Sequence, residues 1–295
     1  LIIDLRNNGG GSLSDAVTIS GLFLPGGPVV QVKNSKGDIK VLDDTDKYVY
    51  YKGPVIILIN KFSASASEIL AAALQDYGRA LIIGGDHTHG KGTVQTILDM
   101  NRNLPALHRR QYEDLGALKI TIQKFYRING GSTQYKGVEP DIIVPTVLDH
   151  LKSGEKYQDY SLPWDKVEAA QFTPWLTNRF DIKKARQLSA DWIASNAEFD
   201  KIKEQKAKAG ERTERTTIPV YLEGVVKERL EIAELTKDDK TPQTHNTAST
   251  SNKNNDVNDE KIPLKEQLQE DPYVQLAVSL MNKLVLSPQD NKTAL

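Results

Sequence analysis

The sequence predicts an α/β domain followed by a mostly helical C-terminal part. Three features of the 295 residues predict this class: short, wholly apolar runs typical of buried strands, Ala- and Leu-rich segments with helical spacing between them, and Gly-rich turns at their junctions. A strand that is apolar along its whole length is typical of a parallel sheet covered on both faces. We therefore expect such a sheet in the first half of the chain.

The expected elements follow one another along residues 1–146. Val55–Ile59 is the clearest buried strand, and the helix after it ends at Gly78, a residue suited to a helix C-terminus. Residues 34–38 have the composition of a hairpin turn. The expected strands are 1–5, 29–33, 39–42, 55–59, 80–83, 118–126 and 141–144, and the expected helices are 13–24 and 65–77.

From about Thr146 the pattern becomes mainly helical. Residues 183–212, 223–235 and 271–286 predict helices, and 218–222 predicts one strand. Residues 240–261 contain too few apolar side chains to offset the entropy of ordering, which predicts a flexible linker. We therefore divide the chain into four parts: a core at 1–146, a helical extension at 147–239, a linker at 240–262 and a terminal helix at 263–295.

Composition excludes several classes of protein. The 38 Lys and Arg balance 39 Asp and Glu, and the net charge of −1 leaves no basic excess for nucleic-acid phosphates. The sequence has no apolar run long enough for a membrane span. It also has no cysteine, which excludes disulfides, thiolate metal sites and a cysteine nucleophile. Because Leu1 already lies in a predicted core strand, we expect an N-terminal part, with any signal peptide, to precede it.

A serine-rich turn at 62–68 connects the strand at 55–59 with the next helix. A serine at such a turn is exposed at the sheet edge, and the N–H of the following residue can hold a developing oxyanion. Ser65 and Glu68 also have the spacing of a capping box, in which the serine caps the helix. The residues alone favour the cap and leave the nucleophile as the alternative.

A serine nucleophile needs a base, and Lys91 lies in the Gly-rich turn at 90–95. Its pKa must fall from about 10.4 toward neutrality, which requires burial away from carboxylates. We expect the dry surroundings to come from four nearby apolar residues, Ile82, Ile83, Val94 and Ile97. The alternative is an anion-binding or ion-paired lysine.

The five histidines form no recognisable Ser/His/Asp arrangement. His87 and His89 are two residues apart and make half of a metal site, but no carboxylate pattern completes it. We therefore expect no metal.

Five segments, in the same order, resemble the carboxyl-terminal processing peptidases, specifically the tail-specific protease type of the bacterial periplasm. They are 4–11, 62–69, 75–80, 90–95 and 137–142. The resemblance implies a crotonase/Clp-protease-like core and a periplasmic serine endopeptidase that uses no cofactor. Its implied partners are proteins with apolar C-terminal tails, which the family recognises with an upstream PDZ domain, and an adaptor protein.

By this resemblance Ser65 is the nucleophile, Lys91 the general base and Gln95 the residue that orients the lysine amine. The N–H groups of Ala66 and of Gly10 or Gly11 are the implied oxyanion hole. The resemblance favours the nucleophile over the cap for Ser65, and the two roles are compatible.

Asp76 belongs to one of the family motifs but is expected to act from a distance. It follows Ser65 by eleven residues, so on an unbroken helix it lies about 16 Å along the axis. We interpret Asp76 as structural support, with Arg79 as its expected partner.

The loop at 84–90 is one residue longer than is usual in the family, which brings His87 and His89 near Lys91. This loop and the start at Leu1 favour a second hypothesis, a non-catalytic binding or scaffold module of the cell envelope that keeps the fold. The intact Ser65, Lys91 and Gln95 favour the peptidase. Residues 1–295 alone are expected to be poorly active, because the first strand lacks a neighbour on one side.

Overall fold

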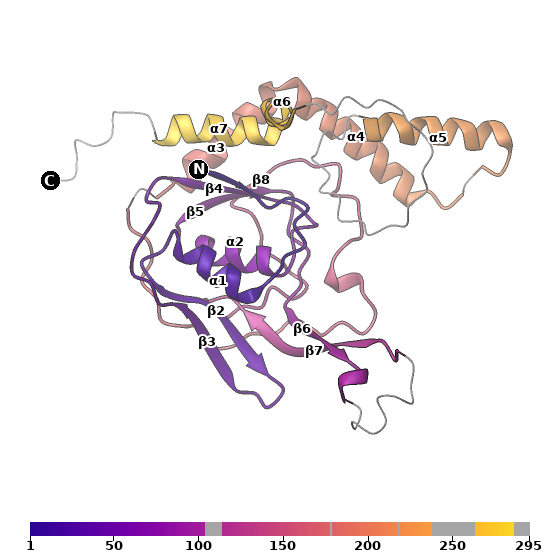
Figure 1. The fold of residues 1–295 in the computed structure, drawn as a ribbon. Coiled ribbons are helices and arrows are strands. Elements are labelled where there is room, and N and C mark those ends of the chain that lie inside the picture. The colour runs from indigo at the N-terminus through magenta and orange to yellow at the C-terminus, as the bar shows by residue number, and fades with distance from the viewer. Residues whose placement is uncertain (104–113, 178, 218, 238–262, 286–295) are drawn as a thin grey trace.

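Two four-stranded sheets enclose a pair of helices in the computed structural model, which describes residues 1–103, 114–177, 179–217, 219–237 and 263–285 (Figure 1). The first sheet has the order β1-β4-β5-β8 and is parallel throughout. Its strands are β1 (Ile2–Asp4), β4 (Val55–Ile59), β5 (Ala80–Gly84) and β8 (Ile142–Ile143). The predicted parallel sheet is confirmed.

The second sheet has the order β3-β2-β7-β6 and is antiparallel. Its strands are β2 (Gly27–Asn34), β3 (Ile39–Asp44), β6 (Thr93–Asp99) and β7 (Ala117–Tyr126). The hairpin around 34–38 is confirmed as β2–β3. Residues 90–95 were predicted only as a turn, so β6 was not predicted. Its alternation of half-buried and exposed residues is that of an edge strand.

Two helices lie between the sheets, α1 (Leu13–Gly21) and α2 (Ala66–Asp76) (Figure 1). Helix α1 begins at Ser12, whose side chain accepts a hydrogen bond from the N–H of Asp15, and it ends three residues before the predicted end. The middle of α2 consists of three buried alanines, 71–73, whose small side chains let it pack closely between both sheets.

Alternate residues of β4 serve two separate cores. Ile57 and Ile59 pack with Leu70 and Leu74 of α2, whereas Ile56 and Leu58 pack against the C-terminal helices. Burial of both faces explains why this strand is apolar at every position. The carboxyl end of the strand, which leads to Ser65, is consequently held on a rigid, fully buried support.

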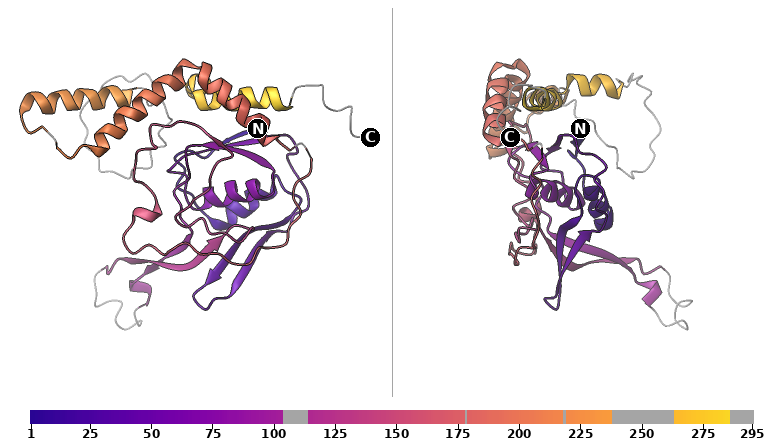
Figure 2. Two further views of the ribbon diagram at one scale, coloured as in Figure 1. Left: turned by 180° about the vertical axis from the view of Figure 1, so that it is seen from behind. Right: turned by 90° about the vertical axis from the view of Figure 1, so that its left-hand side faces the viewer.

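The C-terminal helices cover the outer face of the parallel sheet, and α4 and α5 extend beyond it (Figures 1 and 2). A single residue, Asn196, ends α3 and caps α4, where the sequence had predicted one helical segment. Phe199, Leu276 and Leu280 are fully buried against the sheet. The helices are α3 (Ile182–Ser195), α4 (Ala197–Glu214), α5 (Leu222–Lys237), α6 (Leu264–Glu270) and α7 (Pro272–Val285). None of the described helices combines the length and the hydropathy that crossing a bilayer requires.

The C-terminal half differs in part from the elements predicted for it. The strand predicted at 218–222 is wrong, because the N–H of Val225 bonds to the carbonyl of Tyr221 as α5 begins, and Val220 and Leu222 remain exposed. Of residues 147–177 and 179–181, only Glu155–Tyr157 form a helix, a short 3-10 helix, and the others run irregularly beside the core. The predicted linker at 240–262 lies outside the described residues.

Candidate active site

Ser65 sits in a strained backbone conformation between β4 and α2. Its φ of 58° and ψ of −116° lie outside the regions that a non-glycine residue favours. The following residue, Ala66, is the first of α2, so its N–H is one of the groups without an intrahelical acceptor. A strained serine at a strand-to-helix turn has the geometry of a nucleophile elbow.

The turn that carries Ser65 is bound to the loop that follows β1. Ser63 is buried, and its hydroxyl donates to the Leu5 carbonyl at 2.8 Å and accepts from the Asn60 N–H at 3.0 Å. Asn60 and Asn7 exchange two further hydrogen bonds. Ser63 thus has a structural role, and the turn and the loop form one unit.

Gly10 brings that loop against the turn. A Cβ at Gly10 would lie 2.5 Å from the Ala64 carbonyl oxygen and 2.8 Å from the Ala66 nitrogen, and its φ is +94°. Only glycine permits this approach. The Gly10 N–H donates to the Asn8 side chain at 2.9 Å, whereas no hydrogen bond from the Gly11 N–H to another described residue is found.

Ser65 and Lys91 line one cavity of about 370 Å³. Its other lining residues come from the loop before α1, the start of α1, α2, β6 and β7: Gly11, Ser12, Leu13, Ala66, Ile69, Thr93, Val94, Gln95, Ile97, Lys119 and Phe125. Leu13, Ile69 and Phe125 give it an apolar wall. The cavity therefore joins a hydroxyl, an amine and a surface suited to an apolar side chain.

The Lys91 amine donates to the Oε1 atom of Gln95 at 3.0 Å, its one side-chain hydrogen bond to the described residues. Partial burial lowers the pKa of Lys91, and the nearby charge of Lys119 lowers it further, against a smaller opposing effect of Glu155 and Glu68. Loss of a proton from this amine is therefore easier than from an ordinary lysine, and no carboxylate is bound to it among the described residues.

The dry surroundings of Lys91 differ from the expectation. Ile82 and Ile83 belong to the buried cores on either side of β5 and do not line the cavity, and Ile97 is 71% exposed. Val94 does line it. Lys91 is only half-buried, and the strand that follows it, β6, is an edge strand of its sheet.

Glu68 connects the two parts of the site. Its buried carboxylate accepts hydrogen bonds from the N–H groups of Ser65 (2.7 Å), Gly90 (2.7 Å) and Lys91 (3.1 Å) and from the hydroxyl of Thr88 (2.5 Å). Burial nevertheless outweighs these bonds and raises the pKa of Glu68 to about 7. From the sequence, Glu68 was predicted only as part of a helix cap. A carboxylate on a buried, Ala-rich helix was the signal for a larger role.

Asp76 has a different partner from the one predicted. It forms a two-point contact with the guanidinium of Arg127, with a shortest distance of 2.6 Å, and accepts from Asn129. Arg79 instead donates to three backbone carbonyls, those of Phe23, Tyr51 and Gly53. The pairing with Arg79 is wrong because the chain turns after Gly78 and directs Arg79 toward the loops beside β4.

His87 and His89 both lie beside the lysine loop. His87 contacts Asp86 and Lys156 through Nε2, at 3.5 and 3.4 Å, and His89 lies 3.7 Å from Glu155. Neither histidine lines the cavity that holds Ser65.

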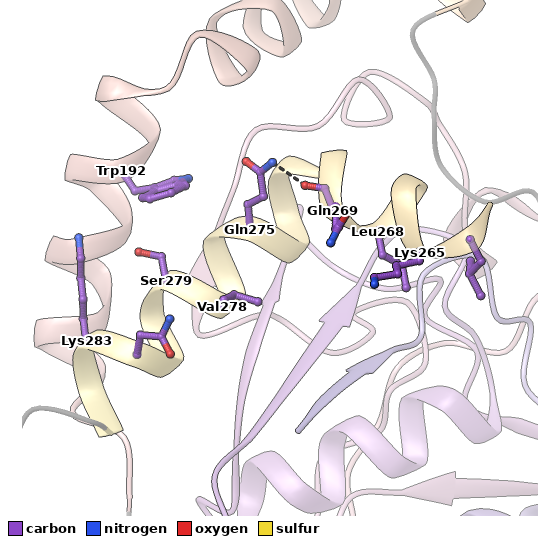
Figure 3. Close-up of a pocket in the computed structure, with 10 residues that line it drawn as sticks. Trp192, Lys265, Leu268, Gln269, Gln275, Val278, Ser279 and Lys283 are labelled. Carbon is purple, nitrogen blue, oxygen red and sulfur yellow. Dashed lines mark hydrogen bonds between the residues drawn. The ribbon is translucent and has the colours of Figure 1, made fainter. Parts of the chain in front are cut away.

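A second, larger cavity of about 850 Å³ lies between α3, α6 and α7 (Figure 3). Trp192 and Val278 line it, and Gln275 bridges to the Gln269 carbonyl at its rim. Its Ser279 lies inside α7, where neighbouring N–H groups are engaged in helix bonds and cannot form an oxyanion hole. The smaller cavity is therefore the candidate active site.

The fold is that of a peptidase core followed by a helical C-terminal domain. Residues 1–144 match the model of peptidase family S41, and residues 148–285 match the C-terminal domain of tail specific protease. The chain belongs to the S41 peptidases of the tail-specific protease type.

Several relatives are similar over part of their length. The tail-specific protease of Haemophilus influenzae is 45% identical over 220 residues, 73% of this chain and 31% of that protein. The carboxy-terminal-processing protease of Bartonella bacilliformis is 40% identical over 57% of this chain and 35% of its own. A solved photosystem II D1 C-terminal processing protease is 30% identical, with a TM-score of 0.40 over 49% of this chain and 34% of that one. The chain thus spans about a third of these relatives' length.

Proposed function

We propose that the protein containing this chain is a serine endopeptidase in which Ser65 is the nucleophile and Lys91 the general base. One observation carries the proposal: a strained serine and a lysine with a lowered pKa line the same cavity, and a neutral amide holds the lysine amine. A carboxylate in the place of Gln95 would keep that amine charged and prevent it from accepting a proton.

In the proposed reaction, Lys91 accepts the proton of the Ser65 hydroxyl as its oxygen attacks the peptide carbonyl. The Ala66 N–H and a glycine N–H of the 9–11 loop stabilise the oxyanion, and Gly11 is favoured over Gly10, whose N–H is engaged by Asn8. The protonated lysine then gives its proton to the leaving amine. Water, activated by the Lys91 amine, then hydrolyses the acyl-enzyme and restores the serine.

The proposed substrates are proteins with apolar C-terminal tails, processed or degraded in the bacterial periplasm. The names of the bacterial relatives support tail-directed cleavage. The apolar wall formed by Leu13, Ile69 and Phe125 supports an apolar residue beside the scissile bond. Gln95 is assigned to orienting Lys91, and Asp76 to supporting the far end of α2.

The test is the Ser65→Ala variant of the full-length polypeptide, assayed on a peptide that ends in small apolar residues. Cleavage is expected to disappear, while Ser35→Ala, an exposed serine of the β2–β3 turn, retains the activity of the unmodified protein. Unchanged turnover in Ser65→Ala refutes the assignment. Binding of the tail without any Ser65-dependent cleavage supports the scaffold hypothesis instead.

A further inference from the structure

The cavity around Ser65 has an unbalanced charge. Two of its lining residues carry a formal charge, Lys91 and Lys119, and both are basic. The proposed function uses Lys91 as a neutral base, so Lys119 is then the one remaining ion of the lining. An exposed cation without a counterion beside the reacting groups is available to bind an anionic group of the substrate.

The position of Lys119 follows from the register of the β6–β7 hairpin. Lys119 pairs directly with Ile97, and Gln95 lies two residues before Ile97. Directly paired residues share one face of a sheet, as do alternate residues of a strand. Gln95, Ile97 and Lys119 therefore project from the same face, toward the cavity that they line together. The effect of Lys119 on the pKa of Lys91 agrees with this proximity.

Lys119 is also unengaged by the described part of the chain. It is exposed, and it makes no side-chain hydrogen bond or ion pair with a described residue. Lys124 of the same strand contrasts with it, because its amine is bound by Asp165 and by the Pro163 carbonyl. The nearby carboxylates have other partners, since Glu68 accepts four hydrogen bonds and Glu155 lies against His89.

We propose that Lys119 is a specificity-determining residue that binds a substrate carboxylate close to the scissile bond. This inference rests on the proposed function. The carboxylate is either the side chain of Asp or Glu in the substrate or the terminal carboxylate of a short C-terminal segment. The apolar wall and Lys119 together then select an apolar residue with an anionic group nearby.

The experiment measures kcat/KM of the full-length polypeptide on matched fluorogenic peptides. One series carries Glu or Gln at each of three positions on either side of the scissile bond. A second series ends two or three residues after that bond, as the free acid or as the amide. In one of these two series, the anionic peptide of each pair is expected to be cleaved about two- to fivefold faster than its neutral match. This ratio is the one expected for a partly exposed ion pair, and added salt is expected to reduce it.

Variants connect the preference to Lys119. Lys119→Gln is expected to abolish it and Lys119→Glu to reverse it, whereas the matched charge change Lys40→Glu, on the distant strand β3, leaves the ratio unchanged. Preference in the first series identifies an acidic side chain as the ligand, and preference in the second identifies the terminal carboxylate.

Two results overturn the inference: equal rates for every matched pair, or a preference that persists in Lys119→Gln. Ser65-dependent cleavage without carboxylate preference refutes the role of Lys119 and leaves the proposed function standing. Cleavage that does not depend on Ser65 refutes both.

Discussion

Replacing Glu68 by Gln tests the connection between the two halves of the site. Each carboxylate oxygen accepts two hydrogen bonds: Oε1 from Thr88 and Gly90, and Oε2 from Ser65 and Lys91. An amide nitrogen in the Oε2 position would face two N–H groups. In the Oε1 position it would face only the Gly90 N–H, because the Thr88 hydroxyl can turn to accept a hydrogen bond. The Gln side chain is therefore expected to place its nitrogen in the Oε1 position.

The loss of one buried acceptor sets the size of the effect. A buried N–H left without a partner destabilises a protein by about 1–3 kcal/mol. The Gly90 N–H stands next to Lys91, so its displacement moves the base. A shift of about 1 Å in a reacting group lowers the rate about 100-fold. We expect Glu68→Gln to be less stable by about 1–3 kcal/mol at pH 5 and to lower kcat/KM by about 10- to 100-fold.

The contribution of Glu68 to the free energy of unfolding changes with pH in a definite direction. The raised pKa of about 7, against 4.5 for an ordinary glutamate, means that the unfolded chain loses this proton before the folded protein does. Unfolding therefore releases a proton between these pH values, and the free energy of unfolding falls as the pH rises through them. The full difference corresponds to about 3 kcal/mol at 1.36 kcal/mol per pH unit. Glu68→Gln lacks this loss, so between pH 5 and pH 8 the difference in unfolding free energy shifts by about 2.5 kcal/mol in favour of the variant, enough to close or reverse it.

Hydrogen exchange of the α2 amides, followed by mass spectrometry at pH 5 and pH 8, measures the local free energy of opening even in a longer polypeptide. The intrinsic exchange rate at each pH supplies the reference. The reasoning is refuted if the difference in opening free energy between Glu68→Gln and the unmodified protein is the same at pH 5 and pH 8. In that case Glu68 is ionised throughout the range, and its four hydrogen bonds outweigh its burial.

Three further outcomes are expected from the same activity and exchange assays. Lys91→Ala abolishes peptidase activity while His87→Ala and His89→Ala retain most of it, and the reverse pattern would reassign the base. Gly10→Ala places a Cβ 2.5 Å from the Ala64 carbonyl oxygen and is expected to lower kcat/KM by about 100-fold or more. Gly9→Ala, which has open space around it, is expected to leave kcat/KM unchanged. Equal effects of the two substitutions would exclude the close approach of Gly10 as the cause. Asp76→Ala leaves Arg127, whose side chain is only 16% exposed, without a carboxylate and with the Gln75 amide oxygen as its remaining side-chain partner. The variant is expected to be destabilised by about 3 kcal/mol without a change in the pH profile of kcat/KM. A displaced profile with unchanged stability would assign Asp76 to the chemistry.

The local sequence pattern was sufficient to predict those strands and helices whose surroundings are the same along their whole length. Val55–Ile59 is apolar at every position because both of its faces are buried, and its parallel pairing followed from that. Strand β6 was missed because an edge strand with one open face includes Gln95, Thr96 and Asp99, which also suit a turn. Val220, Tyr221 and Leu222 are apolar but exposed, so the composition of this segment carried no information about a sheet.

The site residues divide in a similar way. Ser65, Lys91 and the glycines lie in short motifs, where local spacing and the family resemblance identify them. The partners of Asp76 could not be predicted, because Arg127 is 51 residues away and reaches it only through the antiparallel sheet. Lys119 was missed for the same reason: its place beside Ser65 depends on the register of β6 against β7, which no local pattern specifies.

The extra residue at 84–90 is compatible with a working base because the end of the loop is fixed independently of its length. The Thr88 hydroxyl and the Gly90 and Lys91 N–H groups bind Glu68, and the His89 N–H donates to the Ser63 carbonyl at 3.0 Å. Four consecutive residues are therefore anchored to the turn that carries Ser65. An added residue is accommodated before Thr88, where Asp86 is exposed, and the loop that bears the lysine keeps its place beside the serine.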